Sequence, residues 1–272
     1  MLQVGGLYVY PIKSLGGIAV DSALVTSRGL QHDRRLMLVD EDNRFLTQRV
    51  HPMMAWLQPV LEDGSLLIHH KKNSADSLHI PLQPQGSECV RVTVWDDDCE
   101  AILYDEKVNQ WFSRALGFSC RLVYMPDSSE RKVDKKYALR EEITSFSDGY
   151  PMLLIGQASL DDLNKRLDIP VPMNRFRPSI VFTGGEPFAE DQFQAFTVNT
   201  IQFNGVKPCG RCVVTTIDQD DLSISKEPLK TLSSFRLKNN KVLFGQNLLH
   251  HGEGIIRVGD RMNVTNYQPA AI

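Results

Sequence analysis

The first hundred residues consist of short apolar or alternating segments with turn signals between them and no helical pattern. The segments are GGLYVYPI, IAVDSALVT, RRLMLVDED, RFLTQRV, SLLIHH, LHIPL and CVRVTVWD, and EDN, EDGS and PQGSE lie between some of them. In the last segment Val90, Val92 and Val94 alternate with polar residues, which is the two-residue period of a half-buried strand. Closely spaced short strands favour an antiparallel barrel or sandwich over a parallel doubly wound sheet.

Three helical patterns follow, among further strand-like segments. Residues 105–117 repeat apolar side chains at helical spacing and end at a glycine, SLDDLNKRLD begins with Ser159 as a candidate N-cap, and KEPLKTLSSF has Pro228 near its first turn. The strand-like segments are CRLVYM, RPSIVFT, IQFNGV, CVVTTID, KVLFG and IIRVGDRMNV. The sequence therefore predicts a mainly β protein with a few helices (α+β) and a domain boundary near residue 120.

Composition and charge disfavour several classes of protein. The formal net charge is −3, so there is no basic excess for binding nucleic acid. The N-terminal sequence MLQVGGLYVYPIKS lacks the pattern of a signal peptide, and no apolar run approaches the ~20 residues of a membrane span. Five cysteines, an odd number, favour reduced thiols. We therefore expect a cytoplasmic protein with no nucleic-acid partner and no membrane partner.

The segment KPCGRCVVTTID carries the closely spaced pair Cys209 and Cys212. A structural zinc site needs four ligands, and the other cysteines and the two HH pairs do not have the usual ligand spacing. A redox dithiol favours a following helix, whereas VVTTID has a strand-like composition. A single thiolate can instead bind a soft or high-valent metal, and a cysteine can also be a small buried apolar residue. The spacing alone leaves these alternatives open.

The same segment resembles the cysteine motif of the MOSC domain. VYPIKSLGG, GLQHDRRLMLVDED and FLTQR are similar to the N-terminal β-barrel that precedes this domain in one branch of the family. FSDGYPMLLIGQASLDDLN, NRFRPSIVFTGG and FGQN are similar to the MOSC part of that branch, which contains the mitochondrial amidoxime-reducing component and bacterial YcbX-type proteins. The resemblance implies a MOSC N-terminal β-barrel domain over residues 1–120 and a MOSC domain over residues 121–272.

This resemblance implies a molybdenum-cofactor-dependent reductase of N-hydroxylated compounds, namely amidoximes, hydroxylamines and N-hydroxylated base analogues. Cys212 corresponds to the protein ligand of molybdenum, whereas nothing in the resemblance makes Cys209 a ligand. The alternative implied by the family is a sulfur-carrier or molybdenum-cofactor-handling protein in which Cys212 carries a persulfide.

The resemblance also assigns residues that bind the cofactor, a pterin dithiolene with a phosphate. They are Lys13 and Ser14 in YPIKS, Arg34 in HDRR and Arg177 in RFRP, and cationic side chains suit such an anion. Each cation could also be an ordinary solvated charge. Asp148 in FSDG could position a substrate or relay a proton, or could belong to an ordinary Asp-Gly turn.

Turnover by such an enzyme requires electrons from outside the chain. GGLYVYPIKSLGG is not a G-x-G-x-x-G turn that opens a helix, so no nicotinamide or flavin fingerprint is apparent. The plant-type C-x4-C-x2-C spacing is also missing, so we expect no iron–sulfur cluster in this chain. The implied partners are a small N-hydroxylated substrate and an external electron-transfer reductase or iron–sulfur protein.

Overall fold

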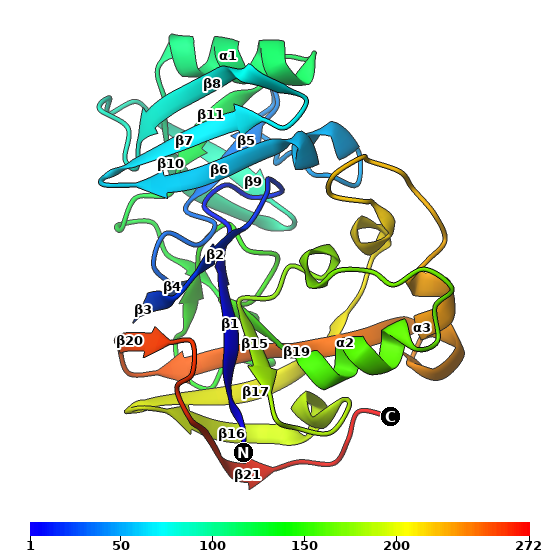
Figure 1. The fold of residues 1–272 in the computed structure, drawn as a ribbon. Coiled ribbons are helices and arrows are strands. Elements are labelled where there is room, and N and C mark those ends of the chain that lie inside the picture. The colour runs from blue at the N-terminus through cyan, green and yellow to red at the C-terminus, as the bar shows by residue number, and fades with distance from the viewer.

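The structure is a computed structural model that describes residues 1–272 apart from the side chain of Ser74. Strands dominate it, and its α-helices are α1 (Glu106–Leu116), α2 (Gln157–Asn164) and α3 (Leu229–Phe235) (Figure 1). The prediction of a mainly β protein with a few helices is confirmed. No helix in the described part of the chain is long and apolar enough to cross a membrane.

The largest sheet has nine strands and occupies the lower half of Figure 1. Its order is β2 (Ile18–Val20), β1 (Gln3–Val9), β15 (Ile180–Thr183), β14 (Met152–Gly156), β19 (Lys241–His251), β17 (Ile201–Gly210), β16 (Phe193–Val198) and β21 (Met262–Tyr267), and β18 (Leu237–Lys238) pairs with β19. Leu7, Leu154 and Phe203 are among the side chains of its hydrophobic core. The core therefore joins strands from both ends of the chain.

A second group of strands packs under helix α1, at the top of Figure 1. One sheet has the order β5 (Leu36–Val39), β11 (Arg121–Tyr124), β10 (Asp97–Leu103) and β9 (Cys89–Val94), and another has the order β6 (Leu57–Glu62), β7 (Ser65–His70) and β8 (Asn73–Pro81). Helix α1 begins after Asp105, whose Oδ1 accepts from the amide of Val108 at 2.9 Å, and ends at Gly117 with a left-handed φ of 78°.

Two smaller sheets complete the fold. They are β20 (Gly254–Arg257) with β3 (Ser22–Thr26) and β4 (Gly29–Leu30), and β12 (Arg131–Lys132) with β13 (Ile143–Thr144). Strand pairing crosses the expected boundary near residue 120 in both directions: β1 pairs with β15 and β3 with β20, while β11 pairs with β5 and β10. The domain limits 1–120 and 121–272 stay a prediction.

Three local predictions were wrong: the strand CVVTTID, the strand RFLTQRV and the N-cap Ser159. CVVTTID does not form a strand: β17 ends at Gly210 and residues Val213–Thr216 form a 3₁₀ helix. The hydroxyl groups of Thr215 and Thr216 donate to the carbonyl groups three residues earlier, at 3.0 and 2.7 Å, and this local bonding overrides the β-branched composition. RFLTQRV forms isolated bridges rather than a strand, because residues 47–50 turn.

Helix α2 starts three residues earlier than Ser159 as its N-cap would imply. It begins at Gln157, and Ser159 is a buried residue inside the helix rather than its N-cap. The Ser159 hydroxyl donates to Oε2 of Glu190 at 2.8 Å, so a tertiary partner uses the group that was expected to cap the helix.

Candidate functional site

Three of the four residues expected to bind the cofactor have left-handed backbone conformations. Ser14 follows β1 with a φ of 67°, Arg34 follows β4 with a φ of 48°, and Arg177 precedes β15 with a φ of 53°. Positive φ is uncommon for residues other than glycine and persists only where the surrounding structure imposes it. These turns hold their side chains in fixed positions near the junction of the two main groups of strands.

Tyr10 lies between two guanidinium groups. Cζ of Arg34 is 4.2 Å and Cζ of Arg177 is 4.3 Å from the centroid of its buried ring, and both contacts are of the cation–π type. Burial raises the pKa of Tyr10 to about 12 against the opposing effect of the two arginines, so the phenol stays neutral. The ring therefore fixes two cations close together without neutralising either.

Arg34 has a buried counter-ion. Its Nη1 donates to Oδ2 of Asp33 at 2.5 Å, and the Asp33 side chain is 1% exposed. Oδ1 of Asp33 also accepts from the backbone amide of Tyr10 at 2.8 Å. Burial lowers the pKa of Arg34, but Asp33 outweighs burial and holds this pKa above its ordinary value. Asp33 thus orients one of the two guanidinium groups.

Arg177 has no such carboxylate. Its Nη1 donates to the carbonyl oxygen of Leu15 at 2.7 Å, and it forms no ion pair with any of the described residues. Burial, with repulsion from Arg34, lowers the pKa of Arg177 to about 10, although Tyr10 opposes the shift. A cation that is desolvated, placed beside a second cation and left without an anion fits a phosphate group well.

Lys13 is a further cation of the site, close to Arg34. Its side chain is buried, and Nζ donates to the carbonyl oxygen of Phe146 at 2.7 Å and to Oδ1 of Asp148 at 2.6 Å. Burial lowers the pKa of Lys13, and Asp148 partly offsets this. The link between residues 13 and 148 joins the N-terminal turn to the segment before β14.

Asp148 is crowded by protein atoms and is also open to solvent, with 70% of its side chain exposed. Crowding raises the pKa of the carboxyl group, but the Lys13 ammonium and a hydrogen bond from Trp95 Nε1 at 3.2 Å outweigh it and hold the pKa far below its usual range. Asp148 is therefore ionised at neutral pH, which makes it a hydrogen-bond acceptor.

The loop that carries Cys212 is tied to this cationic group. Cys212 is exposed and precedes the 3₁₀ helix Val213–Thr216, whereas Cys209 is partly buried and its Sγ accepts from Arg211 Nη1 at 3.0 Å. Nη2 of Arg211 donates to the carbonyl oxygen of Phe176 at 2.6 Å, one residue before Arg177. Arg211 thus anchors the thiol loop, residues 207–216, to the turn that holds Arg177.

Hydrogen bonds through Gln48 also link Gln219, which follows the thiol loop, to the turn of Ser14. The side-chain amides of Gln48 and Gln219 donate to each other at 3.2 and 3.1 Å, and Gln48 Nε2 also donates to the carbonyl oxygen of Ser14 at 2.7 Å. The structure therefore brings the turns of Lys13, Ser14, Arg34, Arg177 and Asp148 together with the loop of Cys212. Within the described residues there is no group of three or more His, Cys, Asp or Glu side chains that could hold a metal ion.

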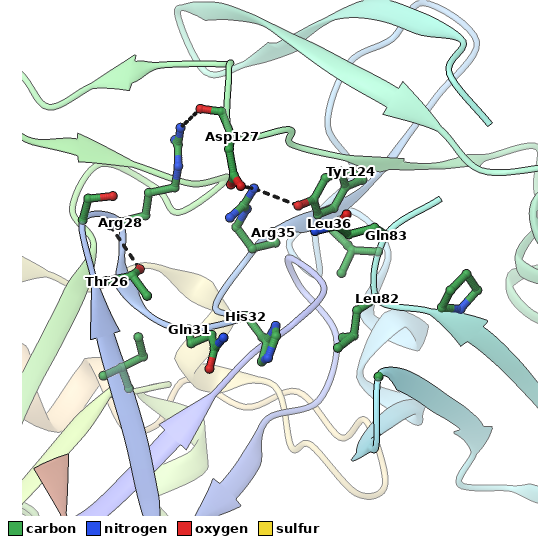
Figure 2. Close-up of a pocket in the computed structure, with 14 residues that line it drawn as sticks. Thr26, Arg28, Gln31, His32, Arg35, Leu36, Leu82, Gln83, Tyr124 and Asp127 are labelled. Carbon is green, nitrogen blue, oxygen red and sulfur yellow. Dashed lines mark hydrogen bonds and ion pairs between the residues drawn. The ribbon is translucent and has the colours of Figure 1, made fainter. Parts of the chain in front are cut away.

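His32 and Arg35 face a different cavity. It is a recess of about 630 Å³, in which Arg35 donates to the Tyr124 hydroxyl at 3.0 Å and to Asp127 Oδ1 at 2.8 Å. Figure 2 shows these three residues at the recess. His32 lines the same recess, and burial followed by the charge of Arg35 lowers its pKa. Adjacent residues Arg34 and Arg35 thus contact separate parts of the molecule.

Sequence reasoning missed four residues that shape the site: Tyr10, Asp33, Trp95 and Arg211. Tyr10 stands inside the quoted motif YPIKS and Asp33 inside HDRR, so both were visible as neighbours of predicted residues. Arg211 stands between the two cysteines. Their roles depend on contacts with residues far away in the chain, which no local pattern reveals.

The fold and the site define a mainly β protein in which a cluster of cations is linked to the loop of an exposed thiol. Residues 1–119 match the MOSC N-terminal beta barrel domain, and residues 141–263 match the MOSC domain. The chain is 32% identical to mitochondrial amidoxime-reducing component 1 of Mus musculus over 94% of this chain and 80% of that protein. It is 33% identical to mitochondrial amidoxime reducing component 2 of Rattus norvegicus over 94% and 81%, respectively.

A third relative is the molybdenum cofactor sulfurase of Oryza sativa subsp. japonica, with 32% identity over 90% of this chain but 32% of that longer protein. The chain therefore belongs to the family of MOSC-domain proteins with an N-terminal MOSC β-barrel, the family of the mitochondrial amidoxime-reducing components.

Proposed function

We propose that this protein is a molybdenum-cofactor-dependent reductase of N-hydroxylated compounds: amidoximes, hydroxylamines and N-hydroxylated base analogues. The observation that carries the proposal is the pair of guanidinium groups on Tyr10, of which Arg177 has no carboxylate partner among the described residues, next to the loop of an exposed thiol. The relatives named amidoxime-reducing components support the same reading.

The residues fit the cofactor by their chemistry. Arg177 and Arg34 would bind its phosphate through guanidinium hydrogen bonds, with Lys13 and Ser14 on the same side of the site. The Cys212 thiolate would be the protein ligand of the metal, because thiolate sulfur suits such a centre and this thiol is exposed. When bound, the cofactor would supply the two electrons of the reduction.

The chain itself handles the protons. Reduction of R–NH–OH to R–NH2 and water consumes two electrons and two protons. Asp148 is ionised, so it accepts a hydrogen bond from the substrate nitrogen rather than donating one. The nearest acid is the Lys13 ammonium, 2.6 Å from Asp148 Oδ1, and burial lowers its pKa so that it gives up a proton more readily. Asp148 would orient the substrate, and the Lys13 ammonium would be the proton donor nearest to it.

The proposed electron donor is an external reductase or iron–sulfur protein, and the proposed compartment is the cytoplasm. Both proposals come from the sequence. The donor would have to reduce the proposed metal centre at Cys212. The charges of Lys13, Arg34 and Arg177 would lie around this centre.

The test is the molybdenum and pterin content of protein purified from a host that makes the cofactor. We expect about one molybdenum per chain in the wild type, as a specific site predicts, and benzamidoxime reduction with an artificial electron donor. Cys212→Ala should lose the metal and the activity, whereas the matched control Cys209→Ala should keep both. A wild type without molybdenum from a competent host would contradict the proposal.

A second candidate function is sulfur or cofactor handling, which the exposure of Cys212 and the similarity to a molybdenum cofactor sulfurase favour. In that case Cys212 would carry a transferable persulfide. Mass spectrometry of the intact wild type and of Cys212→Ala decides between the two. Persulfide sulfur on Cys212 that moves to an acceptor thiol, without benzamidoxime turnover, would establish this function instead.

A further inference from the structure

Trp95 occupies a turn position that does not suit tryptophan. Val94 of β9 pairs with Asp97 of β10, so Trp95 and Asp96 form a two-residue hairpin turn. Trp95 has a φ of 59°. Two-residue hairpin turns with positive φ at the first central position favour glycine there, because a Cβ is strained in that conformation. A bulky side chain held in a left-handed turn points to a role that offsets the strain.

The indole of Trp95 joins the turn to the site described above. Its Nε1 donates to Oδ1 of Asp148 at 3.2 Å, on the carboxylate that Lys13 also contacts. Cζ of Arg49 lies 4.3 Å from the indole ring, and the Phe45 ring centroid lies 5.1 Å from it at an angle of 50°. In spite of these partners Trp95 is 42% exposed. An ordered, half-exposed aromatic surface therefore borders the pair of Asp148 and Lys13.

A cavity of about 370 Å³ lies along this surface. Phe45, Arg49, Trp95 and Thr93 are among the residues that line it. Its size is in the range of sites for small organic ligands. Lys13 Nζ lies 5.3 Å from the centroid of the Phe45 ring, so one wall of this cavity also borders the proposed cofactor site.

We propose that Trp95, Phe45 and Arg49 form a substrate shelf that selects planar aromatic N-hydroxylated compounds. An aromatic ring would stack on the indole or against the Arg49 guanidinium, since both surfaces are flat and attract π systems. The N–OH group of the same molecule would then lie near Asp148 and Lys13, where the proposed reduction takes place. This inference rests on the proposed function and names the substrate class of the same site.

Binding is tested first, without any dependence on the cofactor. The chain has three tryptophans, so the indole N–H region of an ¹⁵N–¹H spectrum should contain three signals, and Trp95→Phe assigns one of them. In the Cys212→Ala protein, benzamidoxime should shift the Trp95 signal in a saturable manner. Acetamidoxime, which has a methyl group in place of the phenyl ring, should shift it much less. A Trp95 signal that does not respond to benzamidoxime would overturn the shelf.

Kinetics with the loaded enzyme provide the second test. Trp95→Gly suits the turn and should fold, and it should lower the ratio of kcat/KM for benzamidoxime to kcat/KM for acetamidoxime by about tenfold, the scale of one lost aromatic contact. The matched control Trp56→Phe should leave this ratio unchanged. An unaltered ratio in Trp95→Gly would overturn the proposal. If the wild type binds benzamidoxime at Trp95 but reduces neither compound, the reductase function fails while the shelf stands.

Discussion

Two neighbouring parts of the site differ in how they are built. The cation cradle, formed by Tyr10, Lys13, Asp33, Arg34 and Arg177, is held by left-handed turns, a buried ion pair and two contacts with one ring. The thiol loop keeps Cys212 exposed and is anchored through Arg211. From this comparison we infer that the proposed anion site is preorganised at a cost to stability, whereas the exposed thiol contributes little to the fold.

The largest predicted effect on stability lies in the cradle. Asp33→Ala should destabilise the protein by about 3–5 kcal/mol, because it leaves the Arg34 guanidinium buried without its counter-ion. Urea unfolding at neutral pH measures this. Asp127→Ala is the matched control, since Asp127 pairs with the adjacent Arg35 but is 82% exposed, and it should cost about 0–1 kcal/mol. Equal losses in the two variants would contradict the distinction between buried and exposed pairs.

An intermediate effect concerns a buried acid outside the cradle. Glu190 accepts from Ser159 and from the amide of Gly156, and burial raises its pKa from 4.5 to about 7. Because this pKa is raised in the folded state, its contribution to stability is fully present below about pH 4.5 and is lost as the pH rises towards 7, by about 3 kcal/mol in total.

Glu190→Gln should remove this pH dependence, with the amide oxygen accepting from Gly156 and the amide nitrogen donating to the Ser159 hydroxyl oxygen. Urea unfolding at pH 5 and pH 7 provides the comparison: the wild type should be less stable at pH 7 on account of this residue, and the variant should show a smaller decrease. A variant with the same decrease as the wild type would show that Glu190 is not the group responsible.

The smallest effect is expected at the thiol loop. Cys212→Ser should change the free energy of unfolding by less than about 0.5 kcal/mol, because the side chain is exposed and surface substitutions are close to neutral. The same unfolding experiment measures this in protein without cofactor. A loss of several kcal/mol would mean that Cys212 is a structural residue and would remove the contrast with the cradle.

Local patterns predicted much of the fold. Strand β9 follows from the alternation of Val90, Val92 and Val94, and helix α1 from its apolar spacing and Gly117. The 3₁₀ helix after Cys212 was missed because the β-branched composition of this segment predicts a strand. Composition does not reveal that the threonine hydroxyl groups donate to local carbonyl groups. The pairing of β1 with β15 joins residues more than 170 positions apart, and no local signal encodes it.

The candidate site was predicted in part. The turns of Lys13, Arg34 and Arg177 lie together as the motifs suggested, but the roles of these residues stay predictions. Tyr10 and Asp33 could not be assigned from sequence because their function is to contact other residues of the site. Trp95 left one readable signal, a tryptophan in the turn of VWDD, where a hairpin favours glycine or asparagine.

The most direct test of the division between cradle and thiol loop is to measure pterin and molybdenum separately in two variants purified from a host that makes the cofactor. Arg177→Gln should lose pterin and molybdenum together, because it removes a phosphate contact. Cys212→Ser should retain more pterin than molybdenum, because it removes only the metal ligand. The opposite pattern, with pterin kept in Arg177→Gln and lost in Cys212→Ser, would contradict the account.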